Sequence, residues 1–266
     1  MKDSAPILTP TVDKPMKRGS RGKAQEAGPV SDDASESGAA RPRKGLQDRV
    51  YAQLKRGLMI GAFVPGQTIT LRKLAETLGT SPMPVREAIA QLVTINALEI
   101  LPNGSVAVPR LTKERFAELS QVRQMLEGMA AAEATLYSTP QLISRLEEIN
   151  KELLKAIKGR NILGCLSKNQ EFHFALYTAY PSEVLLPLIE TLWLQAGPMM
   201  YFSLAAPDTN WDASLHILII AALAEKDASA VKKLIEKDIS TTAKHLLKCS
   251  AFRGDSGPIA ELRLMP

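Results

Sequence analysis

Apolar residues return at helical spacing in the part of the chain that follows residue 45. The first such segment spans residues 46–58, where an apolar side chain recurs every fourth position and Gly61 follows as a stop signal. A second segment spans residues 71–79. A third begins behind Ser81, a suitable helix N-cap, and Pro82 fits the first helical position. The pattern therefore predicts three helices before residue 95.

Two β-prone runs follow in the stretch LEILPNGSVAVPR, on either side of Asn103 and Gly104. Asn-Gly between such runs is a strong hairpin signal, because both residues tolerate the positive φ angles that tight hairpin turns require. A short extended piece is also expected after the turn at Pro65 and Gly66. Two short helices joined by a tight turn and followed by a hairpin make a winged helix-turn-helix, whose second helix enters the DNA major groove.

The rest of the chain is helical in pattern. Thr139 is placed to cap a helix and Pro140 to begin it. Helices are expected over residues 113–136, 140–157, 163–180, 182–204, 212–224 and 227–248. The predicted fold is mainly α, an N-terminal winged helix-turn-helix with a small β-hairpin followed by an antiparallel helical bundle. We predict a disordered basic tail (1–44), a DNA-binding domain (45–110), a ligand-binding and dimerisation domain (111–250) and a C-terminal tail (251–266).

Composition favours helix packing and indicates the cellular compartment. Hydrophobic residues make up 45% of the chain and aromatic residues only 5%, which favours helices over packed sheets. The sequence has no apolar run of the length that a membrane span needs, and no signal peptide. The two cysteines form no disulfide framework or CxxC motif. We therefore expect a cytoplasmic protein without membrane contact.

The basic excess lies at one end of the chain. Residues 1–44 hold nine Lys or Arg against six Asp or Glu, residues 45–110 hold seven against four, and residues 111–266 hold 17 against 18. Such a distribution is typical of a first part that meets a polyanion. In the tail, the clusters KRGSRGK and RPRK either touch DNA phosphates or stay solvated without a fixed role.

The stretch GAFVPGQTITLRKLAETLGTSPMPVREAIAQL resembles the GntR family of bacterial transcription regulators. It carries Gly, an apolar-Pro-Gly, Leu-Ala, Leu-Gly, Ser and Pro-Val-Arg-Glu-Ala in the order that this family shows. The later stretches ELSQVRQMLEGMAA, NQEFHFAL and LHILIIAALAEKDASAVKKLIEKD resemble the helical FCD-type ligand-binding domain of its FadR-like subgroup. Together the resemblance spans residues 46–247 and leaves only the tails outside.

The resemblance implies a set of DNA contacts. Arg86 matches the arginine of the Pro-Val-Arg-Glu motif on the recognition helix; the alternative is a pair with the adjacent Glu87, which does not share its helix face. Arg72 matches an arginine of the preceding helix that approaches DNA in some members. Thr80 and Ser81, at the start of the recognition helix segment, complete the expected contacts of the two helices.

The sequence departs from the family where many members follow the serine with a guanine-reading arginine. Pro82 stands there and cannot donate a hydrogen bond, so that direct readout is absent and a different operator is expected. Met83 either contacts a thymine methyl or packs against the neighbouring helix. At the wing tip, Asn103 and Gly104 either reach the minor groove or a phosphate, or form a plain hairpin turn.

The resemblance also implies a metal site, with two of its four positions altered. Members of the metal-binding type use an Asp and a His four residues apart on one helix, followed by two more histidines. The corresponding positions hold Asn169, His173, His216 and Asp238. Two imidazoles and one carboxylate remain, which suits Zn²⁺, Ni²⁺ or Mn²⁺. The alternatives are two histidines with purely structural roles, or a metal-free pocket in which the same groups bind the effector.

Arg123 corresponds to an arginine that often faces the cavity in this subgroup. It is predicted to bind a carboxylate effector, the alternative being a salt bridge to Glu127 four residues later. We expect a homodimeric, ligand-responsive regulator of double-stranded DNA, acting as a repressor, and not an enzyme. The rival hypotheses are a DNA-binding dimer without a small-molecule ligand and a metal-dependent hydrolase using His173, His216 and Asp238, which would leave the winged helix unexplained.

Overall fold

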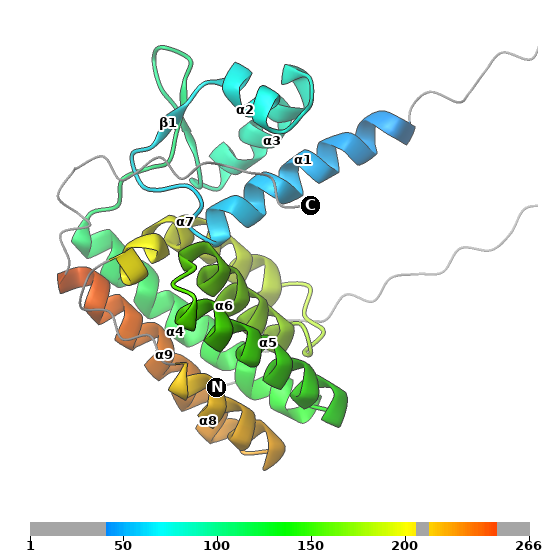
Figure 1. Ribbon diagram of the computed structural model, residues 1–266, viewed down its shortest axis with the longest axis vertical. Coiled ribbons are helices and arrows are strands. Elements are labelled where there is room, and N and C mark those ends of the chain that lie inside the picture. The colour runs from blue at the N-terminus through cyan, green and yellow to red at the C-terminus, as the bar shows by residue number, and fades with distance from the viewer. Residues whose placement is uncertain (1–40, 206–212, 249–266) are drawn as a thin grey trace, which may run out of the picture. The chain divides into compact units, whose positions relative to one another are not determined.

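The computed structural model describes residues 41–205 and 213–248, with side chains from residue 45 onward (Figure 1). The predicted C-terminal tail and nearly all of the predicted N-terminal tail lie outside these residues. The described part is mainly helical with one small antiparallel sheet, so the predicted fold class is confirmed. None of its helices is both long and apolar enough to cross a membrane.

The first helix, α1 (Arg41–Met59), begins four residues before the predicted domain boundary. Its basic first turn has no apolar periodicity, so the hydrophobic pattern could not include it. The predicted apolar positions Val50, Leu54 and Leu58 are buried, whereas Leu46 is exposed. The helix gives way to Gly61 at φ +65°, a backbone conformation that glycine adopts without strain.

Helices α2 (Leu71–Thr77) and α3 (Pro82–Thr94) form the predicted two-helix unit. The Thr70 side chain accepts a hydrogen bond from the backbone N–H of Lys73 and so caps α2. The unit closes over one apolar core, because α3 turns its periodic residues inward: Val85, Ala88, Ile89 and Leu92. This burial fixes which side of α3 faces outward.

The sheet contains three short strands in the order β1-β3-β2. Strands β2 (Glu99–Ile100) and β3 (Val106–Ala107) form the predicted hairpin, with Ile100 opposite Val106. Strand β1 (Thr68–Ile69), the extended piece after the Pro-Gly turn, pairs with the other edge of β3 in antiparallel register. The hairpin is therefore anchored to the helix-turn-helix, which makes it a wing.

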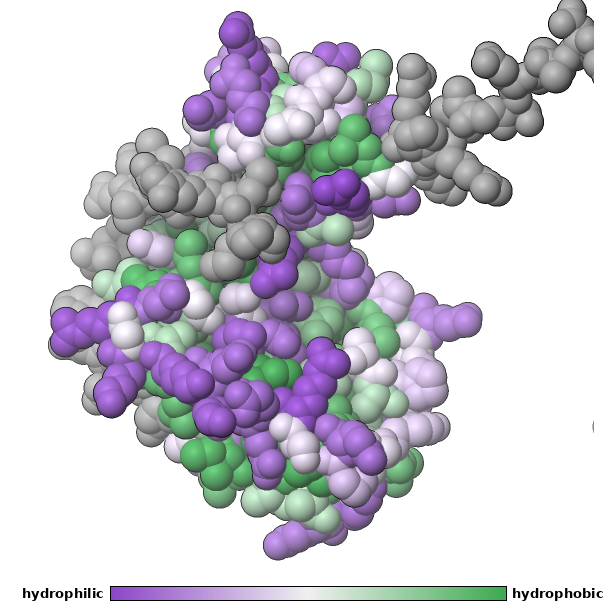
Figure 2. Space-filling model, turned by 45° about the vertical axis from the view of Figure 1, so that its right-hand side comes forward, coloured by the Kyte–Doolittle hydropathy of each residue, from purple (hydrophilic) through white to green (hydrophobic). Residues whose placement is uncertain are grey.

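In the described part of the chain, six helices form the bundle that follows: α4 (Lys113–Leu136), α5 (Pro140–Lys158), α6 (Ile162–Tyr177), α7 (Leu185–Ala205), α8 (Ser214–Ala224) and α9 (Ala228–Lys248). The long helices α4 and α9 run side by side in Figure 1 and α5 packs against α6. On the face drawn in Figure 2, hydrophilic side chains cover most of the surface and hydrophobic ones emerge in smaller patches.

Two predicted helix ends were wrong by three residues, for local reasons. Helix α6 ends at Tyr177 rather than at residue 180, and Thr178 caps its end. Helix α7 begins at Leu185 rather than at Ser182, because the Ser182 hydroxyl accepts a hydrogen bond from the Leu185 N–H, as an N-cap does. The predicted start of α8 at Asp212 lies outside the described residues.

Helix α7 touches both α1 and the end of α3. Gly197 lies directly against the backbone of Leu58 and Met59, at the end of α1. The Gln195 amide donates a 3.1 Å hydrogen bond to the carbonyl of Ile95, which is the C-cap residue of α3. The bundle is thereby in direct contact with the recognition helix.

Candidate metal centre and nucleic-acid interface

The outward side of α3 carries two of the predicted DNA-contacting residues. Met83 is 61% exposed, so it does not pack against the neighbouring helix. Arg86, three residues later and on the same side of the helix, is also exposed. No hydrogen bond or ion pair joins Arg86 to Glu87 or to another residue of the described chain. Its guanidinium is free to meet a phosphate or a base edge.

Arg72 and the two residues before α3 differ in how available their side chains are for contact with DNA. Arg72, on α2, is exposed and its Nε lies 3.0 Å from Glu76 Oε1, an ion pair that leaves the other guanidinium nitrogens open. Ser81 occupies the predicted N-cap position of α3 and is exposed, but its hydroxyl makes no capping bond. The Thr80 hydroxyl oxygen is covered and has no partner within the described chain, which makes it a poor DNA contact as it stands.

The wing tip is an exposed turn. Gly104 has φ +78° and its N–H donates to the Leu101 carbonyl, while Asn103 Oδ1 accepts from the Ser105 N–H. Asn103 therefore shapes the turn with its oxygen and keeps its amide NH₂ for other partners. The turn geometry supports the hairpin reading and leaves the contact to DNA as a prediction.

Three of the four predicted metal ligands meet in the bundle. One ligand atom each from His173 on α6, His216 on α8 and Asp238 on α9 lie within 4.8 Å of one another. The histidines are buried and their ring centroids are 5.4 Å apart. His173 Nε2 lies 3.2 Å from Asp238 Oδ2. Three helices that are separated in sequence thus place two imidazoles and one carboxylate together.

His216 is held as a neutral imidazole. Burial lowers its pKa to about 4, against an opposing attraction to the Asp238 carboxylate. Its ring stacks on Phe172 with 3.8 Å between ring centroids, and its Nδ1 lies 3.2 Å from Asn150 Oδ1. Because the amide oxygen only accepts, the single ring proton lies on Nδ1 and the lone pair on Nε2.

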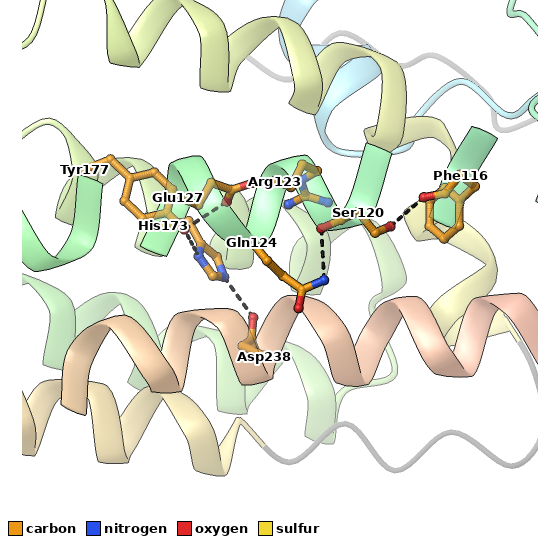
Figure 3. A network of polar contacts seen from close by, with 8 residues as sticks. All are labelled: Phe116, Ser120, Arg123, Gln124, Glu127, His173, Tyr177 and Asp238. Atoms are coloured by element: carbon orange, nitrogen blue, oxygen red, sulfur yellow. Dashed lines mark hydrogen bonds and ion pairs between the residues drawn. The ribbon is translucent and has the colours of Figure 1, made fainter. Parts of the chain in front are cut away.

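His173 belongs to a buried chain of polar contacts, drawn in Figure 3. Its Nδ1 lies 2.8 Å from the Tyr177 hydroxyl, which donates a 2.9 Å hydrogen bond to Glu127 Oε2. The other oxygen of Glu127 accepts from Arg123 Nε at 2.7 Å. Burial and the adjacent Glu127 carboxylate raise the pKa of Tyr177 well above its ordinary value, so its hydroxyl keeps its proton.

The Asp238 side chain remains an anion in this setting. Burial raises its pKa, but the hydrogen bond to His173 and the attraction to the histidines and Arg123 together lower the pKa below its ordinary value. The side chain is only 23% exposed, so neighbouring groups cover most of it.

Two cavities adjoin the cluster and share Asn169, Asp238 and Thr242 in their walls. The smaller, of about 20 Å³, is also lined by Arg123, His173 and Trp193. The larger, of about 280 Å³, is also lined by His216 and Lys237. Asn169 is buried at this shared wall, and its role as a ligand stays a prediction.

Arg123 forms the salt bridge that was the alternative to its predicted effector contact, and the effector contact stays a prediction. It forms the salt bridge to Glu127, and it lines the smaller cavity with its guanidinium carbon 4.6 Å from the centre of the Trp193 ring. Trp193 Nε1 is buried and makes no hydrogen bond within the described chain. The wall of the cavity therefore contains a cationic group that lies over an indole ring.

The donor set suits a divalent cation. Two donors on one ion lie at most about 4.2 Å apart, twice a bond of about 2.1 Å, so the cluster, whose ligand atoms lie within 4.8 Å of one another, needs to close by at least about half an ångström. Each histidine has Nδ1 beside an acceptor from another side chain, the arrangement that orients metal-bound imidazoles in proteins. Neutral imidazoles and one carboxylate are the ligands that Zn²⁺, Ni²⁺ and Mn²⁺ accept.

Sequence reasoning missed three side chains of this site: Tyr177, Asn150 and Trp193. Tyr177 lies four residues after His173 on one helix, a spacing from which its proximity could have been inferred. Asn150 and Trp193 lie on other helices, and no local pattern connects either of them to the histidines.

Comparisons with known proteins agree with this architecture. Residues 46–108 match the bacterial regulatory proteins of the gntR family, and residues 118–241 match the FCD domain. The HTH-type transcriptional regulator McbR of Escherichia coli is 34% identical over 182 residues, covering 67% of this chain and 82% of McbR. The Uxu operon regulator of Haemophilus influenzae is 26% identical over 223 residues, covering 76% and 82% of the two chains.

Solved structures lead to the same family. The structure of E. coli McbR/YncC matches with a TM-score of 0.69 and 31% identity, covering 75% of this chain and 97% of that one. A putative GntR regulator from Rhodococcus sp. RHA1 shares the fold, with a TM-score of 0.61, 21% identity and coverage of 76% and 98%. With its winged helix-turn-helix and FCD domain, the chain belongs to the GntR family and is a DNA-binding transcription regulator.

Proposed function

We propose that this regulator is a homodimeric repressor whose operator affinity is set by a small organic acid and a divalent cation in its helical domain. The observation that carries the proposal is the convergence of His173, His216 and Asp238 from three helices beside two cavities. Burying two imidazoles and a carboxylate in a core is unfavourable in free energy, and a bound ligand would offset this.

His173, His216 and Asp238 are the proposed cation ligands, and Asn169 is the fourth. The amide oxygen of Asn169 is neutral, so the single negative charge of the set comes from Asp238 on α9. A cation held there would supply positive charge that attracts an anionic group into the cavities. This role needs no chemical reaction, in keeping with a regulator rather than a hydrolase.

The proposed effector is a carboxylate. Arg123 lines the smaller cavity and presents guanidinium nitrogens that Glu127 does not use, and such a fork pairs with a carboxylate through two hydrogen bonds. The unused Trp193 Nε1–H offers a donor for an acceptor group elsewhere on the same acid.

The outer face of α4 is the proposed dimer contact. Apolar side chains lie along it at alternating spacings of three and four residues, the pattern of a helix that packs against a second helix: Val122, Met125, Met129, Ala132 and Leu136. Met125, Met129 and Leu136 are 61%, 51% and 72% exposed, so this seam has no cover from the described part of its own chain. An identical α4 is the partner with the matching pattern, and a two-fold dimer suits a palindromic operator.

The proposed link between effector and DNA passes through α7. On α7, Trp193 lines the smaller cavity and Gln195 forms a hydrogen bond with the C-cap residue of α3. Gly197 packs against the end of α1. An acid that binds more tightly to one position of α7 shifts the population of molecules toward that position, and the recognition helix moves with α7. The difference between the affinities of the acid for the two arrangements sets the size of this population shift. DNA contact is assigned to Arg86, Arg72, Ser81 and Met83, with Asn103 and Gly104 at the wing.

The metal content of protein purified without an affinity tag tests the proposal. We expect about one Zn²⁺, Ni²⁺ or Mn²⁺ per chain by elemental analysis, and a loss of this metal in His173→Ala and His216→Ala, because each removes one of three strong donors. His245→Ala is the matched control, since His245 lies two turns beyond Asp238 on α9 and is not part of the cluster.

Less than a tenth of a metal ion per chain in the parent protein would contradict the metal site. A melting temperature that responds to none of a panel of organic acids, with and without chelator, would favour the rival DNA-binding dimer that has no small-molecule ligand.

A further inference from the structure

The hydrogen bonds around Tyr177 have a fixed direction. Glu127 lies against the Arg123 guanidinium, with Oε1 2.7 Å from Nε, and both side chains are almost completely buried. A carboxylate paired in this way accepts hydrogen bonds and donates none. The Tyr177 hydroxyl has one proton and donates it to Glu127 Oε2 at 2.9 Å. Its oxygen can therefore only accept from His173 Nδ1, 2.8 Å away.

This direction leaves Nε2 as the ring atom of His173 that can bind a cation. The Nδ1 proton is engaged by the Tyr177 oxygen, and Nε2 lies 3.2 Å from Asp238 Oδ2. A positive species at Nε2, either a proton or a metal ion, is what joins the ring to this carboxylate. The ring is thus prepared for a cation on the side where Asp238 and His216 converge.

We propose that Tyr177 and Glu127 are positioning residues for the cation site, which hold His173 in the tautomer whose Nε2 is free to bind. The inference rests on the cation site proposed above. Asp238 competes with Tyr177 for the same ring proton, because an Nε2–H could donate to the carboxylate. Without the Tyr177 oxygen, the proton moves to Nε2 and blocks the ligand position. Arg123 contributes by pairing with Glu127, which keeps the Glu127 carboxylate an acceptor of the Tyr177 hydrogen bond.

Cation affinity in Tyr177→Phe tests this role. We expect Zn²⁺ or Ni²⁺, added alone and measured by competition with a chromophoric chelator, to bind about 10- to 100-fold more weakly than in the parent, as is typical when a partner of a metal-bound histidine is removed. Tyr180→Phe is the matched control, because Tyr180 packs on Tyr137 outside the network and should leave the affinity unchanged. Unchanged affinity in a folded Tyr177→Phe would overturn the proposal.

The protonation of the His173 ring provides a second test that needs no Tyr177 variant. In metal-free protein at neutral pH, long-range ¹H–¹⁵N correlation spectra should show a proton on Nδ1 of His173, with the signal assigned by its absence in His173→Gln. A ring with its proton on Nε2 alone would overturn the relay, even if Tyr177→Phe fails to fold. Parent protein that binds neither Zn²⁺ nor Ni²⁺ would instead overturn the cation site itself, which separates the two failures.

Discussion

Arg86 combines three properties at one residue: it is exposed, it has no ion pair within the described chain, and it lies on the side of α3 opposite the buried face. Surface arginines commonly pair with a nearby carboxylate. Here the adjacent Glu87 cannot serve, because neighbouring residues on a helix point in different directions.

Arg86→Ala should weaken binding to the DNA upstream of the regulator's own gene by about tenfold or more, since one lost arginine contact to a base is worth about 1–3 kcal/mol. Mobility-shift titrations at one fixed salt concentration measure this. Arg145→Ala, an exposed arginine on α5, removes the same charge from the bundle and should have little effect. An equal loss in both variants would point to general charge rather than to a contact on α3.

The residues of the candidate site were predictable to different degrees. His173, His216 and Asp238 follow from the family resemblance, and the structure brings them together. The Glu127 pair with Arg123 follows from helical spacing. Asn150 was not predictable, because its contact with His216 depends on how α5 packs against α8, and hydrophobic periodicity says nothing about which polar side chain will lie opposite an imidazole.

At the scale of whole elements, the contact between α7 and α1 depends on one missing side chain. A Cβ at Gly197 would overlap the Leu58 carbonyl oxygen and approach Met59 Cα to 2.8 Å. Both are backbone atoms, so neither can turn away as a side chain could. Pro198 follows inside the same helix and lacks the N–H that would continue the ladder of hydrogen bonds. The end of α1 therefore packs closely against α7 at Gly197, where α7 has no side chain.

Gly197→Ala should destabilise the protein by about 1–3 kcal/mol, the usual cost of overpacking a close contact. A lower urea midpoint in chemical denaturation measures this. The control is Gly45→Ala in α1, where a Cβ meets nothing within 4 Å and alanine is the better helix former, so stability should hold or rise. If Gly197→Ala is as stable as the parent, the close approach of α1 to α7 is not a feature of the protein in solution.

Helix positions were predicted well, and some helix ends were not. Helix α4 spans the predicted residues 113–136, and α5 begins at Pro140 behind its Thr139 cap, because capping residues and periodicity agree there. Helix α7 was predicted to start too early, because Ser182 was counted as helical although its side chain caps the turn. Strand β1 was predicted only as an extended piece, because its partner strand β3 lies far along the chain.

At the scale of the whole molecule, the exposed apolar seam on α4 is the feature that a monomer leaves unexplained. Large side chains at Met125, Met129 and Leu136 face outward on the same helix whose other side is buried against α9 and α7. Apolar side chains that line up in this way usually mark a contact with another protein surface.

Met129→Glu should raise the dimer dissociation constant by about 100-fold or more, because the dimer would have to bury an unpaired carboxylate in an apolar seam. Sedimentation equilibrium over a range of protein concentrations measures it. Leu154→Glu places the same charge on α5, at a residue that is 40% exposed and outside the seam, and should leave the dimer intact. A parent protein that sediments as a monomer, or a Met129→Glu dimer of undiminished affinity, would exclude this seam.

The position of Asp238 on the last described helix also bears on how the protein is made. His173 is synthesised long before Asp238, so a nascent chain holds both imidazoles before it holds the carboxylate. The proposed cation site is complete only when α9 has emerged and docked along α4. Loading of that proposed site would then be the final event of maturation, and a chain released early would carry the winged helix without the complete cluster.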